Sequence, residues 1–146
     1  MTPESLRDRL IRMYRLTFDC VQLEDSIKVT TPYVYPDGSR VEVFVTGPEG
    51  QETVTDFGCM TRWIKRYTGY SPDDPQNKWI DWVCKIKDIH RCDEALVWPH
   101  PHYEHIEISV NELAKAASWA ADAVFEAKDV ERMEKYMRDY EEEEER

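Results

Sequence analysis

Two short turn signals within one strand-rich segment constrain the fold of this chain more than any other feature. The turns are Tyr35-Pro36-Asp37-Gly38 and Gly47-Pro48-Glu49-Gly50, and proline, aspartate and glycine are the residues that tight turns favour. The runs that these turns separate are rich in β-branched residues, which strands favour. Because such short turns join only antiparallel neighbours, the segment from Ser26 to Gly58 predicts a three-stranded antiparallel meander.

The pattern within this segment also indicates which face of the meander is buried. The first strand is expected over residues 27–35, and the third over Thr53 to Thr55. In the second strand, valine occupies every second position from Val41 to Val45, so the valines are predicted to face the core. The preceding stretch from Phe18 to Asp25 fits neither a helix nor a strand clearly.

Three segments in the first 95 residues have apolar residues at the spacing typical of helices. These helices are predicted at about residues 3–16, 60–69 and 75–90. Thr2 with Pro3 is a typical helix start, and Asp74 with Pro75 is another. In each pair the first residue can cap the helix, and proline suits the first helical position.

The last third of the chain predicts a hairpin followed by one long helix. Apolar residues on either side of Pro99-His100-Pro101-His102 indicate the hairpin, namely Leu96, Trp98, Ile106 and Ile108. Ser109-Val110-Asn111-Glu112 then has the form of a capping box. The helix that it opens is expected to continue to about Tyr140, because apolar residues recur at spacings of three and four. Such a helix would be roughly 40 Å long.

Together these elements predict an α+β fold. The expected order is an N-terminal helix, the three-stranded antiparallel meander, two helices, a second hairpin and a long C-terminal helix, with helices covering one face of the sheet. A chain of 146 residues fits one domain, which is expected over residues 1–140. Residues 141–146 should form a frayed acidic tail, because five consecutive glutamates there meet the negative end of the helix dipole.

The charge of the chain favours a protein partner over a nucleic acid. The formal net charge is −11, and residues 126–146 hold 10 acids and 5 bases. Such a chain is a poor candidate for direct binding to nucleic acid, which depends on neutralising phosphates. It is suited to a partner with a basic surface that normally binds nucleic acid. The alternative is that the charge only maintains solubility.

Two further features concern location. The sequence contains no apolar run of the roughly 20 residues that span a bilayer, and its first residues lack the apolar centre of a signal peptide. A cytoplasmic protein without membrane contact is therefore expected. Its four cysteines, Cys20, Cys59, Cys84 and Cys92, are expected to be reduced.

Two groups of residues have the chemistry to bind metals, although neither forms a complete motif. Asp37 and Asp56 could hold a hard cation if they met at one end of the sheet, but both also suit a turn or a helix cap. The second group consists of zinc-ligand types without a standard spacing, namely Cys84, His90, Cys92, His100, His102 and His105. No catalytic residue, bound metal or cofactor is predicted.

The segment on which the fold prediction rests also resembles a known family. Thr31-Pro32-Tyr33, Asp37-Gly38, the strand from Val41 to Val45, and Thr55-Asp56-Phe57-Gly58 together resemble the DUF1828 domain family, clearest over residues 26–68. The resemblance implies a bacterial or phage origin and no settled activity. The acidic C-terminal helix lies outside the pattern of that family.

The functional expectation is a noncatalytic acidic binding protein, plausible as a phage or mobile-element inhibitor of a bacterial defence or regulatory complex. It would occupy a basic nucleic-acid-binding surface of that partner. The alternatives are a structural protein that forms a homodimer through the long C-terminal helix, and a metal-dependent hydrolase. The expected partner-binding residues are the acids of that helix, Glu126, Asp129, Glu131, Glu134, Asp139, Glu141, Glu142 and Glu143.

Overall fold

The computed structural model describes residues 1–99, 105–124 and 129–145. Within these ranges it contains α-helices, one short 3₁₀ helix and one antiparallel sheet whose strands differ in length. This confirms the predicted α+β class. The elements in chain order are α1 (Pro3–Tyr14), β1 (Asp19–Gln22), β2 (Ser26–Val34), β3 (Arg40–Thr46), β4 (Thr53–Thr55), α2 (Cys59–Thr68), α3 (Asp74–Lys87), β5 (His90–Cys92), β6 (Ala95–Val97), α4 (Ile106–Ala120), η1 (Ala121–Ala123) and α5 (Val130–Glu144).

The predicted meander forms the centre of a larger sheet. Strands β2, β3 and β4 are consecutive antiparallel neighbours, and the full strand order is β1-β2-β3-β4-β6-β5. The sequence did not indicate β1. This strand lies in the stretch from Phe18 to Asp25 that fitted neither a helix nor a strand, and it pairs with β2. Val29 and Val43 face each other in the register and are both fully buried, as the valine alternation predicted.

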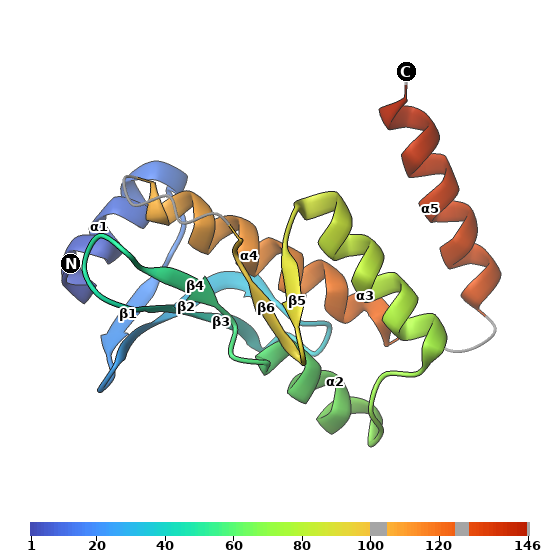
Figure 1. Ribbon diagram of the computed structural model, residues 1–146, viewed down its shortest axis with the longest axis horizontal. Coiled ribbons are helices and arrows are strands. Elements are labelled where there is room, and N and C mark those ends of the chain that lie inside the picture. Colours follow the sequence, from blue (N-terminus) through green and yellow to red (C-terminus); the bar gives the residue numbers. More distant parts are fainter. Residues whose placement is uncertain (100–104, 125–128, 146) are drawn as a thin grey trace.

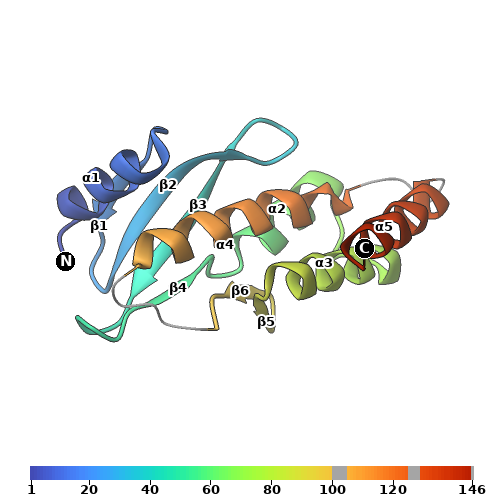
Figure 2. The ribbon, with the colours of Figure 1, turned by 90° about the horizontal axis from the view of Figure 1, so that it is seen from above.

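Helix α4 covers the buried face of this sheet. It packs against β2, β3, β4 and β6, and α1 packs against β1 and α4. Figure 2 shows α4 lying across the strands, and Figure 1 shows α1 and α5 at opposite ends of the molecule. The core between these layers is built from fully buried aliphatic and aromatic side chains, including Leu6, Phe18, Val41 and Leu113.

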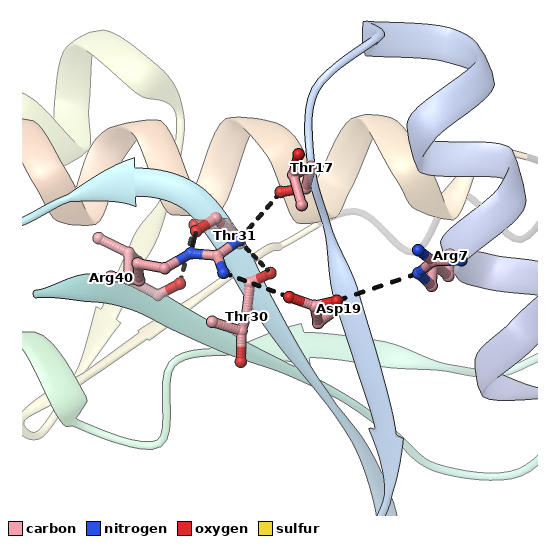
Figure 3. A network of polar contacts seen from close by, with 7 residues as sticks. Arg7, Thr17, Asp19, Thr30, Thr31 and Arg40 are labelled. Atoms are coloured by element: carbon pink, nitrogen blue, oxygen red, sulfur yellow. Dashed lines mark hydrogen bonds and ion pairs between the residues drawn. The ribbon is translucent and has the colours of Figure 1, made fainter.

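Arg40 stabilises an irregularity in the pairing of β2 with β3. The register of these strands shifts within Thr30–Val34, and a shift of this kind removes backbone groups from the regular ladder. The Arg40 guanidinium donates to the carbonyl oxygens of Thr31 at 2.8 Å and Thr17 at 3.0 Å, and to Asp19 Oδ2 at 3.2 Å (Figure 3). One side chain therefore links β1, β2 and β3 at the shift.

The helix starts agree with the predicted chemistry in one case and differ by one residue in another. Thr2 caps α1 in a capping box with Ser5, as its position before Pro3 predicted. Helix α3 is capped by Asp73 instead of Asp74. The Asp73 side chain accepts from the Gln76 N–H at 2.9 Å, and the Gln76 side chain accepts from the Asp73 N–H at 2.9 Å. Asp73 is the cap because it lies three residues before Gln76, the spacing at which the two residues can form both hydrogen bonds of a capping box.

The second hairpin exists, but its predicted position was wrong. It consists of β5 and β6, which turn at Asp93 and Glu94, whereas Ile106 and Ile108 belong to α4. Asp93 adopts a left-handed backbone conformation with φ 55°, which aspartate tolerates better than most residues. Of the predicted turn at residues 99–102, all but Pro99 lies outside the described residues.

The predicted long C-terminal helix is present as α5, but its expected start at Ser109 and its continuity from there were wrong. Helix α4 begins at Ile106, so Ser109 is a buried residue inside the helix and not its N-cap. The helical region then changes to η1 after Ala120 and resumes as α5 at Val130. Helix α5 ends at Glu144, so most of the acidic run that was expected to fray lies within the helix.

In the part of the chain that the structure describes, no helix is long and apolar enough to cross a membrane.

Candidate partner-binding site

The predicted partner-binding acids lie mainly on α5 and at the residue directly before it. Asp129 precedes the helix; Glu131 and Asp139 are exposed, and Glu134 is partly buried. Glu141, Glu142 and Glu143 are exposed in the last turns. Glu126 lies outside the described residues. The structure therefore brings seven of the eight predicted residues to one helix and its first flanking residue.

The acids are unevenly distributed along this helix. Residues 129–138 contain three acids, Asp129, Glu131 and Glu134, and three bases, Arg132, Lys135 and Arg138, so their formal charges cancel. Residues 139–145 contain six acids, Asp139 and Glu141 to Glu145, and no base. The negative surface is thus concentrated in the last two turns of α5. We call residues 139–145 the acidic tip.

An apolar face of α5 packs on three tryptophans of the rest of the structure, residues 1–124, which we call the body. These tryptophans, which we call the aromatic seat, are Trp79 and Trp82 on α3 and Trp119 on α4. The Tyr140 ring lies 5.4 Å from Trp82 and 5.9 Å from Trp119, measured between ring centroids. Tyr136 lies 5.9 Å from Trp79. These separations fall within the range of favourable aromatic pairs.

Two methionines complete the contact between α5 and the body. Met133 and Met137 are 6% and 9% exposed, although both belong to a helix whose other residues are mostly exposed or partly buried. They lie at spacings of three and four from Tyr136 and Tyr140, which places all four side chains on one face of α5. The opposite face is consequently left to charged residues.

One polar contact ties the acidic tip to the aromatic seat. Trp82 Nε1 donates to Glu141 Oε1 at 2.9 Å, so this carboxylate fixes the tip while its neighbours stay exposed. A weaker contact joins Lys78 Nζ and Glu134 Oε1 at 3.5 Å. Figure 1 shows the C-terminal end of α5 standing away from the strands and from α4.

A pocket of about 440 Å³ lies between the aromatic seat and the start of α5. Its wall includes Trp79, Trp119 and Tyr136 together with the charged residues Asp122, Asp129 and Arg132. Burial raises the pKa of the Asp122 carboxyl. The pocket therefore combines aromatic faces with two carboxylates and one guanidinium.

Asp56 and Asp37 do not form the cation site that their chemistry allowed. Asp56 is fully buried: its Oδ1 accepts from the Gly58 and Leu96 N–H groups at 2.8 Å each, and its Oδ2 accepts from the Met60 N–H at 3.1 Å. Burial raises the pKa of this carboxyl, and the three backbone donors oppose that effect. Asp37 is exposed and accepts from Ser39 N and Oγ. Both residues therefore organise turns.

The cysteine and histidine group is brought together only in part. Cys84, His90 and Cys92 all line one open hollow at the end of α3. Among the described residues, no group of three histidine, cysteine or acidic side chains has the geometry to hold a metal ion. His105 is exposed before α4, and His100 and His102 lie outside the described residues. All four cysteines are free, and burial raises the pKa of the Cys84 thiol to about 11.

Sequence reasoning identified the acids but missed the aromatic seat that holds them. Trp79 and Trp82 lie three residues apart, which places them on one face of a helix, but this spacing does not tell what packs against them. The signal was present in Met133, Tyr136, Met137 and Tyr140, whose spacing predicts one apolar face on a helix that is otherwise charged. The contact of that face with the tryptophans depends on where α5 lies relative to α3 and α4. The spacing of apolar residues does not predict this arrangement.

No family model, no curated protein and no solved structure matches this chain. The resemblance to the DUF1828 family stays a prediction.

Proposed function

We propose that this protein is a noncatalytic binding protein whose acidic tip occupies a basic surface of a partner protein. The observation that carries the proposal is the concentration of six acids and no base in residues 139–145, the last turns of α5 and its C-cap residue. This arrangement opposes helix stability, because negative side chains are unfavourable at a helix C-terminus. Binding to a positively charged surface would offset this repulsion and make the clustered acids favourable.

The packing of α5 on the aromatic seat supports a binding role. A helix held on one face by the aromatic seat presents its acids with little freedom to rearrange, and this lowers the entropy cost of binding. Glu141 is fixed by Trp82, while Asp139, Glu142 and Glu143 stay exposed. Charged groups placed in this way increase association rates and select partners of opposite charge.

The chemistry of the partner follows from the charge. A basic surface that accepts closely spaced carboxylates is also suited to the phosphates of a nucleic acid. We infer that the partner is a nucleic-acid-binding protein and that the acidic tip competes with its DNA or RNA. The resemblance to DUF1828 extends this proposal to a phage or mobile-element inhibitor of a bacterial defence or regulatory complex, acting in the cytoplasm.

The proposal is tested by capturing partners from a bacterial lysate and then titrating the purified complex with duplex DNA and with RNA. We expect at least one nucleic acid to displace the protein, and we expect the affinity to fall steeply with salt. A complex that forms unchanged with nucleic acid already bound, and that is insensitive to salt, would contradict the mimicry proposal.

Self-association through the C-terminal helix is the second candidate. Its support is that α5 is attached to the body by side chains that an identical helix from another copy could replace. In this form the homodimer would exchange α5 between copies. Sedimentation at tens of micromolar tests this candidate, because a monomer at that concentration excludes it as the main function. A metal-dependent hydrolase has less support, since Asp56 serves three backbone donors.

A further inference from the structure

A second pocket, of about 230 Å³, lies where the turn after β2 meets α2. Its charged lining consists of Arg40, Glu42, Arg62 and Arg66. Three bases and one acid give a formal charge of +2, in a chain whose formal net charge is −11. This pocket is therefore a local positive site on a negative protein, and it is far along the chain from the acidic tip.

Two of the three arginines have donors available for a ligand. Arg40 already donates from all three of its nitrogens to backbone carbonyls and to Asp19 (Figure 3). Arg62 is held by two hydrogen bonds, from Nη1 to the Phe57 carbonyl at 2.7 Å and from Nη2 to Cys59 Sγ at 3.2 Å. A guanidinium carries five N–H groups, so Arg62 is positioned and still has donors left. Arg66 lies one turn further along α2.

Tyr35 also lines this pocket, and its hydroxyl is buried without a hydrogen-bond partner. Tyr35 is 5% exposed, and its hydroxyl oxygen makes no hydrogen bond within the described part of the chain. The ring is fixed because it stacks on Trp63 with a centroid distance of 5.0 Å and an interplanar angle of 14°. A buried polar group that lacks a partner destabilises the fold, so a ligand that accepts from it would remove that cost.

The protonation of the neighbouring groups suits an acceptor. Burial is the main reason that the pKa of Tyr35 is raised, followed by the acidic groups around it, so the phenol keeps its proton and can donate. Burial also raises the pKa of Cys59, which leaves this residue a neutral thiol. Glu42 is the negative group in the lining. Asp56 already caps the first turn of α2, so a ligand would be held by side chains.

We propose that this pocket binds a phosphate group through Arg62, Arg66 and the Tyr35 hydroxyl. Guanidinium groups match the geometry of phosphate oxygens, and hydrogen bonds to a charged acceptor are the stronger class. The pocket is smaller than the roughly 300 Å³ at which sites for whole small-molecule ligands begin. It therefore suits inorganic phosphate or the phosphate end of a small phosphomonoester. This inference goes beyond the proposed function and does not depend on it.

The test uses the whole protein at constant ionic strength, titrated with inorganic phosphate, with phenyl phosphate and with chloride. Tryptophan fluorescence reports binding through Trp63, and thermal unfolding gives a second readout, because a ligand that binds the native state raises Tm. Arg66→Gln and Tyr35→Phe should each weaken phosphate binding about tenfold or more. The matched control is Arg138→Gln on α5, which removes the same charge away from the pocket and should bind phosphate as the parent protein does.

Tyr35→Phe keeps the ring and removes only the hydroxyl, so it should fold at least as well as the parent protein in the absence of phosphate. Phosphate should then raise its Tm less than that of the parent. Phenyl phosphate that binds more tightly than inorganic phosphate would indicate a phosphomonoester; equal or weaker binding would indicate the free ion. Phosphate that binds no better than chloride, or equal binding by the parent and both variants, would overturn the proposal. Neutralising the acidic tip should leave phosphate binding unchanged, which separates this test from the proposed function.

Discussion

The body of the molecule and α5 are held in place by different kinds of contact. In the body, α4 buries aliphatic side chains such as Val110 and Leu113 against a hydrogen-bonded sheet. Helix α5 is held by ring contacts, two methionines and the hydrogen bond from Trp82 to Glu141. The first kind of contact is extensive and continuous, whereas the second covers one face of one helix. We therefore expect α5 to detach at a lower free energy than the body needs to unfold.

The largest expected effect tests the body. Leu113 is fully buried on α4, so Leu113→Ala should lower the free energy of unfolding by about 2–5 kcal/mol through lost burial and the cavity left behind. Denaturant titration measures the change. Ile108→Ala on the same helix is the matched control, because Ile108 is 38% exposed and should cost clearly less. Equal losses at the two positions would contradict the assignment of the core face.

A smaller effect is expected at the turn between β4 and α2. Asp56→Asn keeps the shape of the side chain but turns one acceptor oxygen into a donor, which leaves a buried backbone N–H unpaired. The cost should be about 1–3 kcal/mol, measured by denaturant titration. Asp37→Asn is the control: Asp37 is exposed, and asparagine also suits its turn. If both variants are equally stable, Asp56 does not have the structural role described above.

The next prediction tests how α5 is attached. Trp82→Phe keeps one aromatic ring but removes the N–H that donates to Glu141, together with part of the ring surface that packs against Tyr140. We expect a loss of about 1–2 kcal/mol, since the acceptor is charged but the site is partly exposed. Hydrogen exchange should show faster exchange in α5 and unchanged protection in α4. Equal acceleration in both helices would show that α5 and the body open as one unit.

The smallest effect is expected at the ion pair between α3 and α5. Lys78 Nζ and Glu134 Oε1 are 3.5 Å apart, and their side chains are 59% and 41% exposed. Lys78→Ala should therefore change the stability of the α5 contact by less than about 0.5 kcal/mol, as followed by hydrogen exchange in α5. A change as large as that of Trp82→Phe would mean that charge, and not the aromatic seat, holds the helix.

The parts of the fold that sequence reasoning located well depend on local chemistry. Strands β2 to β4 were predicted within about a residue because the turns at Pro36 and Pro48 carry their own signals. The second hairpin was misplaced because its true turn at Asp93 and Glu94 contains neither proline nor glycine. Residues 106–110 alternate between apolar and polar types, which mimics a strand. The structure instead buries Ile106, Val110 and Leu113, at helical spacing.

The candidate site shows the same limit. The acids could be named from the sequence because they are concentrated in residues 126–143. The apolar face of α5 could be recognised because its residues recur at helical spacing. Their arrangement depends on contacts between residues far apart in the chain, such as Trp82 with Glu141, and on the interruption of the helix after α4. The pocket proposed to bind phosphate was missed for this reason too, since Tyr35 and Arg66 come from separate parts of the chain and no local pattern links them.

The acidic tip as the partner-binding surface is the central claim, and it is tested most directly by comparing two variants with equal changes in charge. One carries Asp139→Asn, Glu142→Gln and Glu143→Gln, which spares Glu141; the other carries Asp8→Asn, Glu24→Gln and Asp25→Asn at exposed positions in the first 25 residues. The dissociation constant of the captured partner is measured for each at 50 and 200 mM salt. We predict that the tip variant binds at least about tenfold more weakly than the parent at low salt and with a reduced salt dependence, while the second variant follows the parent. Equal affinities and equal salt dependence for the two variants would show that only net charge matters, and would contradict the claim.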